Sequence, residues 1–179
     1  KIAGLLSYLD KEYIMTAKLG EETDTYDAEG TVTAKVERFN ISFSEINEAL
    51  QEFLGYTDQI PPMYSALKRQ GKALYELARE GIEVERAPRR VLINSIEIIN
   101  FETPFLTVKV SCSKGTYIRS LCHDMGRKLG TGAHVTGLVR TRIGHFRIED
   151  SADISELPQK KSALYTIDYS LHHLPEIVV

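Results

Sequence analysis

Tyr117 and Arg119 are the two residues whose types and spacing most suggest chemistry. They follow Lys114-Gly115-Thr116 and open a stretch, residues 116–129, whose apolar residues recur at helical spacing. The first turn of a helix has unpaired N–H groups and the positive end of the helix dipole, so negative groups are favoured there. An arginine at this place can hold a carboxylate with two parallel hydrogen bonds, which a lysine cannot do. The alternative is a surface ion pair with Asp124, which is five residues further on and poorly placed.

Other kinds of reactive site find little support in the sequence. Cys112 and Cys122 are the only cysteines, and no histidine stands at zinc-ligand spacing from a cysteine or carboxylate, so neither a disulfide framework nor a metal site is expected. Asp24, Asp27 and Asp124 show no pairing typical of a hydrolase that uses two carboxylates. Because the sequence has no cleavable leader and no apolar run of about eighteen residues, we expect no membrane segment and a soluble, cytoplasmic protein.

Charged residues are distributed unevenly along the chain, although the net charge is only −3. Residues 1–60 carry 5 basic and 12 acidic side chains, residues 61–147 carry 15 and 7, and residues 148–179 carry 2 and 6. A basic middle segment suits a surface that contacts nucleic-acid phosphates, because each Lys or Arg near a phosphate releases counterions. Charge alone equally allows a solvated basic face.

Hydrophobic periodicity predicts the elements that position these residues. We expect strands over residues 12–19, 31–39, 91–101, 105–112 and 138–148, and an acidic loop over residues 21–30. Helices are expected over residues 2–9, 42–54, 73–80, 116–129 and 162–174; the second has a capping-box pattern, Ser42 with Glu45. The strands come in runs and no βαβ unit repeats, so the 179 residues predict one domain with an α+β fold around a largely antiparallel sheet.

Three separate segments resemble the motifs of the TruB family of bacterial tRNA pseudouridine synthases, and they occur in the family's order. The first runs from Lys11-Glu12-Tyr13 through Leu19-Gly20 to Asp27 and Gly30. The second is Gln59-Ile60-Pro61-Pro62-Met63-Tyr64-Ser65-Ala66-Leu67-Lys68, with Leu74-Tyr75-Glu76-Leu77-Ala78-Arg79-Glu80-Gly81 after it. The third is Ser113-Lys114-Gly115-Thr116-Tyr117-Ile118-Arg119, followed by Gly132-Ala133-His134-Val135 and Leu138.

The resemblance implies an enzyme that converts the T-loop uridine of tRNA to pseudouridine. This isomerisation breaks the glycosidic bond, turns the base and rejoins it through carbon, and it requires no cofactor. A uridine in a folded T arm must first be flipped out and then held by aromatic stacking and hydrogen bonds. The implied fold is the pseudouridine-synthase sheet flanked by helices. The implied partner is the T arm of tRNA, bound by a monomer.

By the same resemblance, five residues of this chain belong to the active site. Tyr13 stacks on the target uracil, Tyr117 contacts the flipped nucleotide and Leu138 lines the base pocket. Arg119 pairs with the catalytic aspartate, and Asp27 is a candidate second carboxylate for this arginine. Two alternatives stay open, because without its motif Tyr13 would be a core tyrosine, and an aspartate beside a glycine equally suits a turn.

Residues that the resemblance places near RNA are Lys1, Lys68 and Arg140, together with Tyr64 at the Pro61-Pro62 turn. Residues 61–90 resemble the family's RNA-gripping thumb. The part from residue 68 onward is rich in Lys and Arg and has few apolar anchors. We therefore expect that part to be mobile when RNA is absent.

The family's nucleophilic aspartate lies in a motif like Gly-Thr-Leu-Asp-Pro, which is expected upstream of residue 1 because Asp10 is followed by Lys11 rather than proline. The last residues resemble the junction with an RNA-binding PUA domain. Residues 1–179 are thus expected to form part of a pseudouridine synthase catalytic domain, without its N-terminal part and its PUA domain, and to be inactive alone. A non-catalytic RNA-binding module is the alternative.

Overall fold

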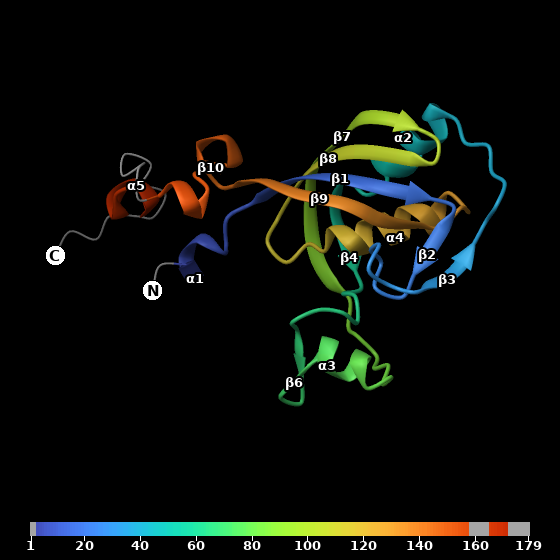
Figure 1. Ribbon diagram of the computed structural model, residues 1–179, viewed down its shortest axis with the longest axis horizontal. Coiled ribbons are helices and arrows are strands. Elements are labelled where there is room, and N and C mark those ends of the chain that lie inside the picture. The colour runs from blue at the N-terminus through green and yellow to red at the C-terminus, as the bar shows by residue number, and fades with distance from the viewer. Residues whose placement is uncertain (1–2, 158–164, 172–179) are drawn as a thin grey trace.

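The computed structural model describes residues 3–157 and 165–171, and its centre is an antiparallel six-stranded sheet (Figure 1). The strand order is β10-β9-β1-β8-β7-β4. The strands are β1 (Lys11–Leu19), β4 (Gly55–Gln59), β7 (Arg89–Glu102), β8 (Phe105–Cys112), β9 (Ala133–Ile143) and β10 (Phe146–Arg147). The α+β fold around a largely antiparallel sheet is confirmed.

Two helices, α2 (Phe43–Gln51) and α4 (Ile118–Lys128), pack on one face of this sheet. Side chains of a strand alternate between the two faces, so one set is buried under the helices. The buried set comprises Met15, Ala17 and Leu19 of β1 and Leu106, Val108, Val110 and Cys112 of β8. The helices contribute Ile46, Leu50, Ile118, Leu121, Cys122 and Met125 to the same core.

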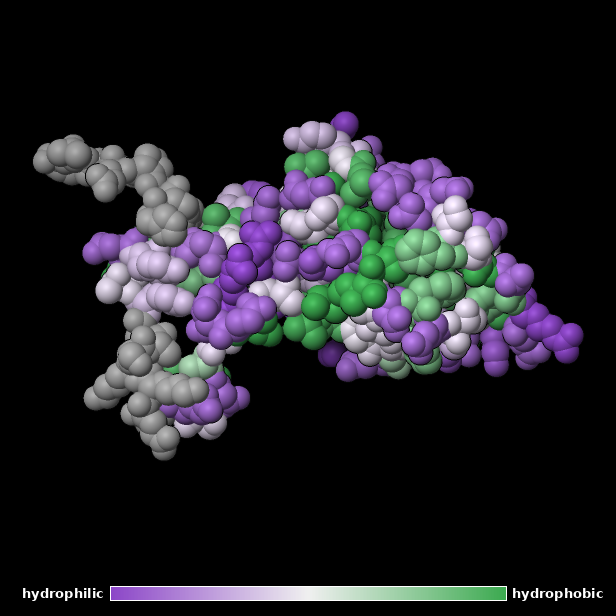
Figure 2. Space-filling model, turned by 90° about the horizontal axis from the view of Figure 1, so that it is seen from above, coloured by the Kyte–Doolittle hydropathy of each residue, from purple (hydrophilic) through white to green (hydrophobic). Residues whose placement is uncertain are grey.

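The opposite face of the sheet has a different character. Thr16 of β1 and Thr107 of β8 share a hydrogen bond there, 3.2 Å between the hydroxyl oxygens, and Lys109 forms an ion pair with Glu97 at 2.7 Å. The buried side chains are thus concentrated on the side where α2 and α4 lie. Figure 2 views the molecule from above, and on that surface hydrophobic residues lie in the middle with hydrophilic residues around them.

Several element boundaries differ from those predicted. The capping box of α2 is present, but the helix ends at Gln51, and Gly55, with φ +85°, instead begins the unpredicted strand β4. Strand β9 spans residues 133–143 rather than 138–148, and α4 begins at Ile118 rather than at residue 116. The expected acidic loop contains the strand β2 (Glu21–Thr23), which pairs with β3 (Val32–Lys35), shorter than the strand predicted over residues 31–39.

The two ends of the described chain are short elements. Helix α1 spans Ala3–Leu6, less than the predicted residues 2–9, and α5 spans Ile167–Leu171, while much of the helix predicted over residues 162–174 lies outside the described residues. Two single 3-10 turns, η1 (Ile148–Asp150) and η2 (Ile154–Glu156), precede α5. No helix among the described residues is long and apolar enough to cross a membrane.

Residues 61–90, up to the point where β7 begins at Arg89, form a segment that projects away from the sheet (Figure 1). It contains the two-stranded ribbon of β5 (Lys68–Arg69) and β6 (Lys72–Ala73), and the helix α3 (Leu74–Arg79). The root of the segment, around Pro61 to Ser65, is mostly buried, whereas most residues from Lys68 to Arg90 are at least partly exposed. This exposure fits the expected mobility, which stays a prediction.

Helix α4 and the start of strand β9 are in close contact at Gly126. A Cβ atom added there would lie 2.3 Å from the backbone nitrogen of Ala133 and 2.5 Å from the carbonyl carbon of Gly132. These neighbours are backbone atoms, which cannot rotate away as a flexible side chain would. The absence of a side chain at this position therefore sets how deeply α4 sits on the sheet.

We predict that Gly126→Ala lowers the free energy of unfolding by roughly 1–3 kcal/mol, the usual cost of overpacking. In an open helical position the same change would instead be neutral or stabilising. Gly4→Ala in α1 is the matched control, because a Cβ there would meet nothing within 4 Å. Urea denaturation measures both, and an equally stable Gly126→Ala protein would show that the helix can shift.

Candidate functional site

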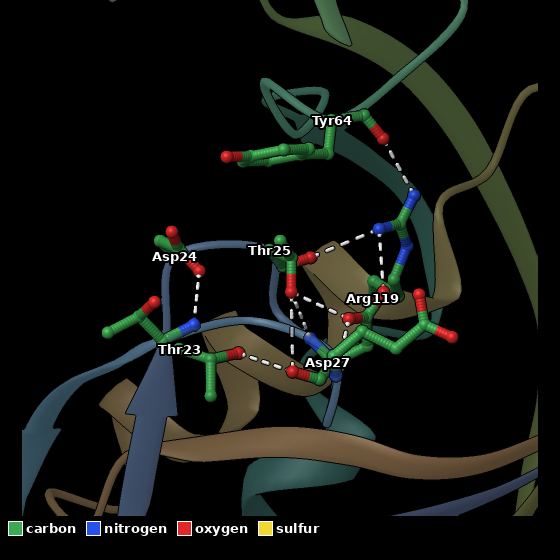
Figure 3. Close-up of polar contacts among 8 residues, drawn as sticks. Thr23, Asp24, Thr25, Asp27, Tyr64 and Arg119 are labelled. Atoms are coloured by element: carbon green, nitrogen blue, oxygen red, sulfur yellow. Dashed lines mark hydrogen bonds and ion pairs between the residues drawn. The ribbon is translucent and has the colours of Figure 1, made fainter. Parts of the chain in front are cut away.

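Arg119 lies in the first turn of α4 and is the centre of a polar network (Figure 3). Its Nη1 donates to the carbonyl oxygen of Thr25 at 3.1 Å and to Oδ2 of Asp27 at 2.8 Å. Its Nη2 donates to the carbonyl oxygen of Tyr64 at 2.8 Å. The guanidinium thus joins α4, the turn after β2 and the root of the projecting segment. The side chains of Arg119 and Asp27 are 25% and 26% exposed, so water screens their ion pair less than it would at the surface.

Asp27 also organises the turn in which it stands. Its Oδ1 accepts hydrogen bonds from the hydroxyl of Thr25 at 2.6 Å and from the N–H of Glu29 at 3.2 Å, while its carbonyl accepts from Thr23 and Gly30. Both interpretations of this aspartate therefore describe real contacts, since it shapes the turn and also pairs with Arg119. The alternative partner for the arginine, Asp124, is not among the groups that contact it.

The turn is attached to β9 by backbone contacts. The N–H of Val135 donates to the carbonyl of Tyr26 at 3.0 Å, and the N–H of Ala28 donates to the carbonyl of Val135 at 2.9 Å. Tyr26 has φ +65°, a conformation that costs energy for a residue with a side chain and persists only where its surroundings enforce it. The ring of Tyr26 stacks on His123 of α4, with 3.9 Å between ring centroids.

Gln59, at the end of β4, fastens the other side of α4. Its Nε2 donates to the carbonyl of Tyr117 at 3.0 Å, and its Oε1 accepts from the N–H of Tyr117 at 2.7 Å. Tyr117 is the N-cap of α4, and its side chain makes no capping hydrogen bond. The amide of Gln59, only 4% exposed, binds the backbone of this N-cap residue from β4 instead. The hydroxyl of Ser120 donates to the carbonyl of Ile60 at 3.0 Å, one residue further along.

Tyr13, Leu138 and Arg140 lie on the face of the sheet that α4 covers. Leu138 stands opposite Met15 in the β1–β9 register and Arg140 stands opposite Tyr13, so all of these side chains point to the same side. Tyr13 is packed against the core cluster that includes residues of α4, whereas Leu138 is 44% exposed. Tyr13 and Tyr117 are therefore not on opposite faces; a cleft bounded by Tyr13, Tyr117, Arg119 and Leu138 together stays a prediction.

Burial raises the pKa of the Tyr13 phenol, and the guanidinium of Arg140 beside it acts in the opposite direction. The phenol is therefore neutral near pH 7, with the ring against the core and the hydroxyl towards Arg140. This environment suits stacking and hydrogen bonding more than the abstraction of a proton. Tyr13 packs partly against the core, as the interpretation as a core tyrosine expected, and its stacking on a base stays a prediction.

A hollow of about 320 Å³ lies on the Tyr64 side of the Arg119 network. Its lining includes the stacked rings of Tyr26 and His123, together with Asp24, Tyr64 and, from the projecting segment, Ile82. Tyr13, Tyr117 and Leu138 are not among its lining residues. Among the described residues, no three His, Cys, Asp or Glu side chains gather as a metal site requires.

Two family models together match nearly the whole chain. The model of the TruB family pseudouridylate synthase N-terminal domain matches residues 1–118, and the model of the tRNA pseudouridylate synthase B C-terminal domain matches residues 119–174. The chain belongs to the TruB family. In this TruB chain the boundary between the two matches falls in the first turn of α4, and β9 of the second match pairs with β1 of the first.

Curated relatives of this TruB chain carry the name tRNA pseudouridine synthase B. The protein of Aromatoleum aromaticum is 46% identical over 182 residues, which cover 99% of this chain and 59% of the relative. The protein of Dehalococcoides mccartyi is 44% identical over 180 residues, which cover 97% and 60%. The chain therefore spans about three fifths of the length of the curated relatives it matches.

Solved structures show the same fold. A chain of a Cbf5–Nop10–Gar1 complex is similar with a TM-score of 0.64 and 25% identity, covering 94% of this TruB chain and 46% of that chain. A chain of an H/ACA RNP bound to a substrate RNA containing 2′-deoxyuridine gives a TM-score of 0.60 over 98% of this chain and 40% of that chain, and at 22% identity it shows the fold alone.

The remaining TruB-like positions are dispersed. Lys68 is exposed in β5, and Arg140 is exposed in β9. Tyr64 contributes its backbone carbonyl to Arg119, while its ring lines the hollow. Lys1 lies outside the described residues. Among the predicted site residues, the structure joins Arg119 to Asp27 through their side chains and to Tyr64 through its backbone carbonyl, and it places Arg140 beside Tyr13.

Gln59 and Thr25 contact residues of the candidate site in this TruB chain, and the analysis of the sequence gave neither of them a role. The carbonyl of Thr25 has no side-chain signature, so nothing in the sequence could have indicated it. Gln59 does begin the second TruB-like motif, and a polar residue directly before Ile60-Pro61-Pro62 is the signal that could have indicated it. Only the fold shows that its target is the start of α4.

We predict that Gln59→Leu lowers the free energy of unfolding by about 1–3 kcal/mol, because the half-buried N–H of Tyr117 loses its acceptor. Gln51→Leu at the end of α2 is the matched control, since Gln51 is exposed and the change is chemically identical. Urea denaturation followed by circular dichroism measures both. Equal stability of the two variants would contradict a capping role for Gln59.

Proposed function

We propose that this chain supplies the base pocket and the arginine-holding part of a tRNA pseudouridine synthase that isomerises the T-loop uridine. The observation that carries the proposal is the fixed position of Arg119, which Asp27 and two backbone carbonyls hold at the start of α4. Membership of the TruB family and relatives named tRNA pseudouridine synthase B support it.

The donors of Arg119 support its pairing with a further carboxylate. A guanidinium has five N–H donors, and the contacts with Thr25, Asp27 and Tyr64 use three of them. The two left over by these described contacts are the Nε donor and one Nη2 donor, which together form an edge that matches a carboxylate. We propose that this edge holds the nucleophilic aspartate ionised and oriented, and that the aspartate comes from sequence upstream of residue 1.

The roles of the other residues follow from what their surroundings favour. Tyr13, with its phenol neutral, stacks on the flipped uracil; Tyr117 contacts the same nucleotide from the start of α4, and Leu138 gives the pocket an exposed apolar wall. No cofactor is needed, because the reaction rearranges one nucleoside. Tyr64, Lys68 and Arg140 contact RNA around the pocket.

The proposed partner is the T arm of tRNA, which residues 61–90 grip as a thumb. This segment is exposed, basic and fixed to the active site at its root, where the carbonyl of Tyr64 binds Arg119. Its charges would contribute affinity without reading sequence, and this contribution weakens steeply as salt rises. The monomeric state and the cytoplasmic location stay predictions.

We predict that residues 1–179 alone bind T-arm RNA weakly but form no pseudouridine, since Arg119 can only orient a nucleophile. Tritium release from uridine-labelled tRNA measures turnover. Sustained release above a control without protein would place the nucleophile within this chain. The same chain extended by its upstream coding sequence is expected to be active, and an inactive extended protein that still binds RNA would instead indicate a binding module.

In the extended protein, we predict that Arg119→Lys lowers the rate of tritium release on the order of 100-fold, because lysine keeps the charge and loses the two-donor edge. The affinity for RNA should change much less. Arg127→Lys is the matched control, since Arg127 lies on the same helix with its side chain 68% exposed. Equal effects on rate and affinity would contradict the orienting role.

A further inference from the structure

Three basic side chains from three different elements surround the Tyr13 end of the sheet. Lys11 is the first residue of β1, Lys114 lies in the turn after β8, and Arg140 lies in β9. The register explains their proximity: Lys11 stands opposite Cys112, two residues before Lys114, and Arg140 stands opposite Tyr13, two residues after Lys11. Lys11, Tyr13 and Arg140 therefore share one face of the sheet.

None of these three cations forms an ion pair with a carboxylate of the described residues. The acidic group nearest in sequence, Asp10, accepts a hydrogen bond from Nδ2 of Asn94 at 3.2 Å. Its negative charge raises the pKa of Lys11, but the two side chains form no ion pair. On the other face of the same sheet, by contrast, Lys109 is paired with Glu97. The positive charge around Tyr13 is thus left largely uncompensated by the protein.

Lys11 is the most constrained of the three. Its ammonium donates to the carbonyl oxygens of Ser7 and, at 2.6 Å, Leu9, which leaves one of its three donors for another acceptor. Burial lowers the pKa of Lys11, and the positive charges of Arg140 and Lys114 act in the same direction. An anion between these groups would relieve their mutual repulsion.

Lys114 is held over an aromatic ring rather than beside an acid. Its Nζ lies 3.4 Å from the centroid of the Tyr8 ring, a cation–π contact that positions the ammonium without neutralising it. The side chains of Lys114 and Arg140 are both exposed, so a ligand can reach them from solvent. Lys11 is thus held in place by backbone carbonyls, while Lys114 and Arg140 are open to solvent.

We propose that Lys11, Lys114 and Arg140 form a binding site for one phosphodiester of the RNA backbone, next to the nucleotide whose base reaches Tyr13. Phosphate oxygens accept charge-assisted hydrogen bonds from ammonium and guanidinium groups alike. The inference rests on the proposed function, because the stacking of uracil on Tyr13 determines which phosphate is nearby. Holding that phosphate would keep the backbone in the conformation that a flipped nucleotide requires.

The salt dependence of RNA binding tests this site in the present chain. Each phosphate contact contributes roughly 0.7–0.9 to the slope of log Kd against log salt concentration. For a T-arm stem–loop RNA, Lys114→Ala and Lys11→Met should each weaken binding and reduce the slope, by at most the roughly 0.7–0.9 that the one shared phosphate contributes. For a blunt duplex with the same stem sequence, which has no nucleotide to flip, neither variant should alter the slope. Fluorescence anisotropy measures all of these affinities.

Lys109→Ala is the matched control, because it removes the same charge from the opposite face of the sheet. It should leave the stem–loop slope unchanged, and circular dichroism verifies that each variant is folded. If the unaltered chain binds the stem–loop with a steep slope that Lys114→Ala and Lys11→Met leave unchanged, the phosphate site is wrong while the proposed function stands. If the unaltered chain binds no stem–loop RNA, both are wrong.

Discussion

The position of one guanidinium group depends on two segments that are remote from it in sequence. Arg119 donates hydrogen bonds to the carbonyl of Thr25 and the carboxylate of Asp27, both in the turn after β2. It also donates to the carbonyl of Tyr64, in the root of the projecting segment. Two of the three acceptors are main-chain carbonyls, which cannot rotate away as side chains can. The arginine is therefore oriented largely by the fold itself, and such rigidity is what its proposed role requires.

The start of α4 is held in place by contacts with two other parts of the fold, β4 and the turn after β2. Gln59 caps the helix from β4, while the turn that carries Asp27 is bonded to β9 through Val135. Met63 and Ser65, in the root of the projecting segment, are buried beside the residue that binds Arg119. Any displacement of that segment acts first on the carbonyl of Tyr64 and then on the arginine. The position of the projecting segment and the orientation of Arg119 are thus mechanically related.

Patterns with a strong local signal predicted the fold well. The capping box of α2 and the alternation of β1 and β8 are dictated by neighbouring residues, so α2 began where expected and the two strands formed where expected. Strand β4 was missed because it is a short edge strand, Gly-Tyr-Thr-Asp-Gln, in which exposed and buried residues do not differ clearly in polarity. Strand β9 was placed too late, because His134 and Gly137 interrupt the apolar pattern although His134 is buried. The Arg119–Asp27 pair followed from resemblance, whereas the backbone acceptors of Arg119 could come only from the folded chain.

The pairing of β9 with β1 has a consequence for how TruB sequences can exchange parts. The two family models meet at residues 118 and 119, yet α4 and β9, on the second side of that boundary, complete the core that β1 and β8 begin on the first. A recombination event at this boundary would join halves that had never packed together. Viable chimaeras of two relatives would need crossovers that keep α4 and β9 from the same parent as β1. The whole sheet with its helix would then come from one parent.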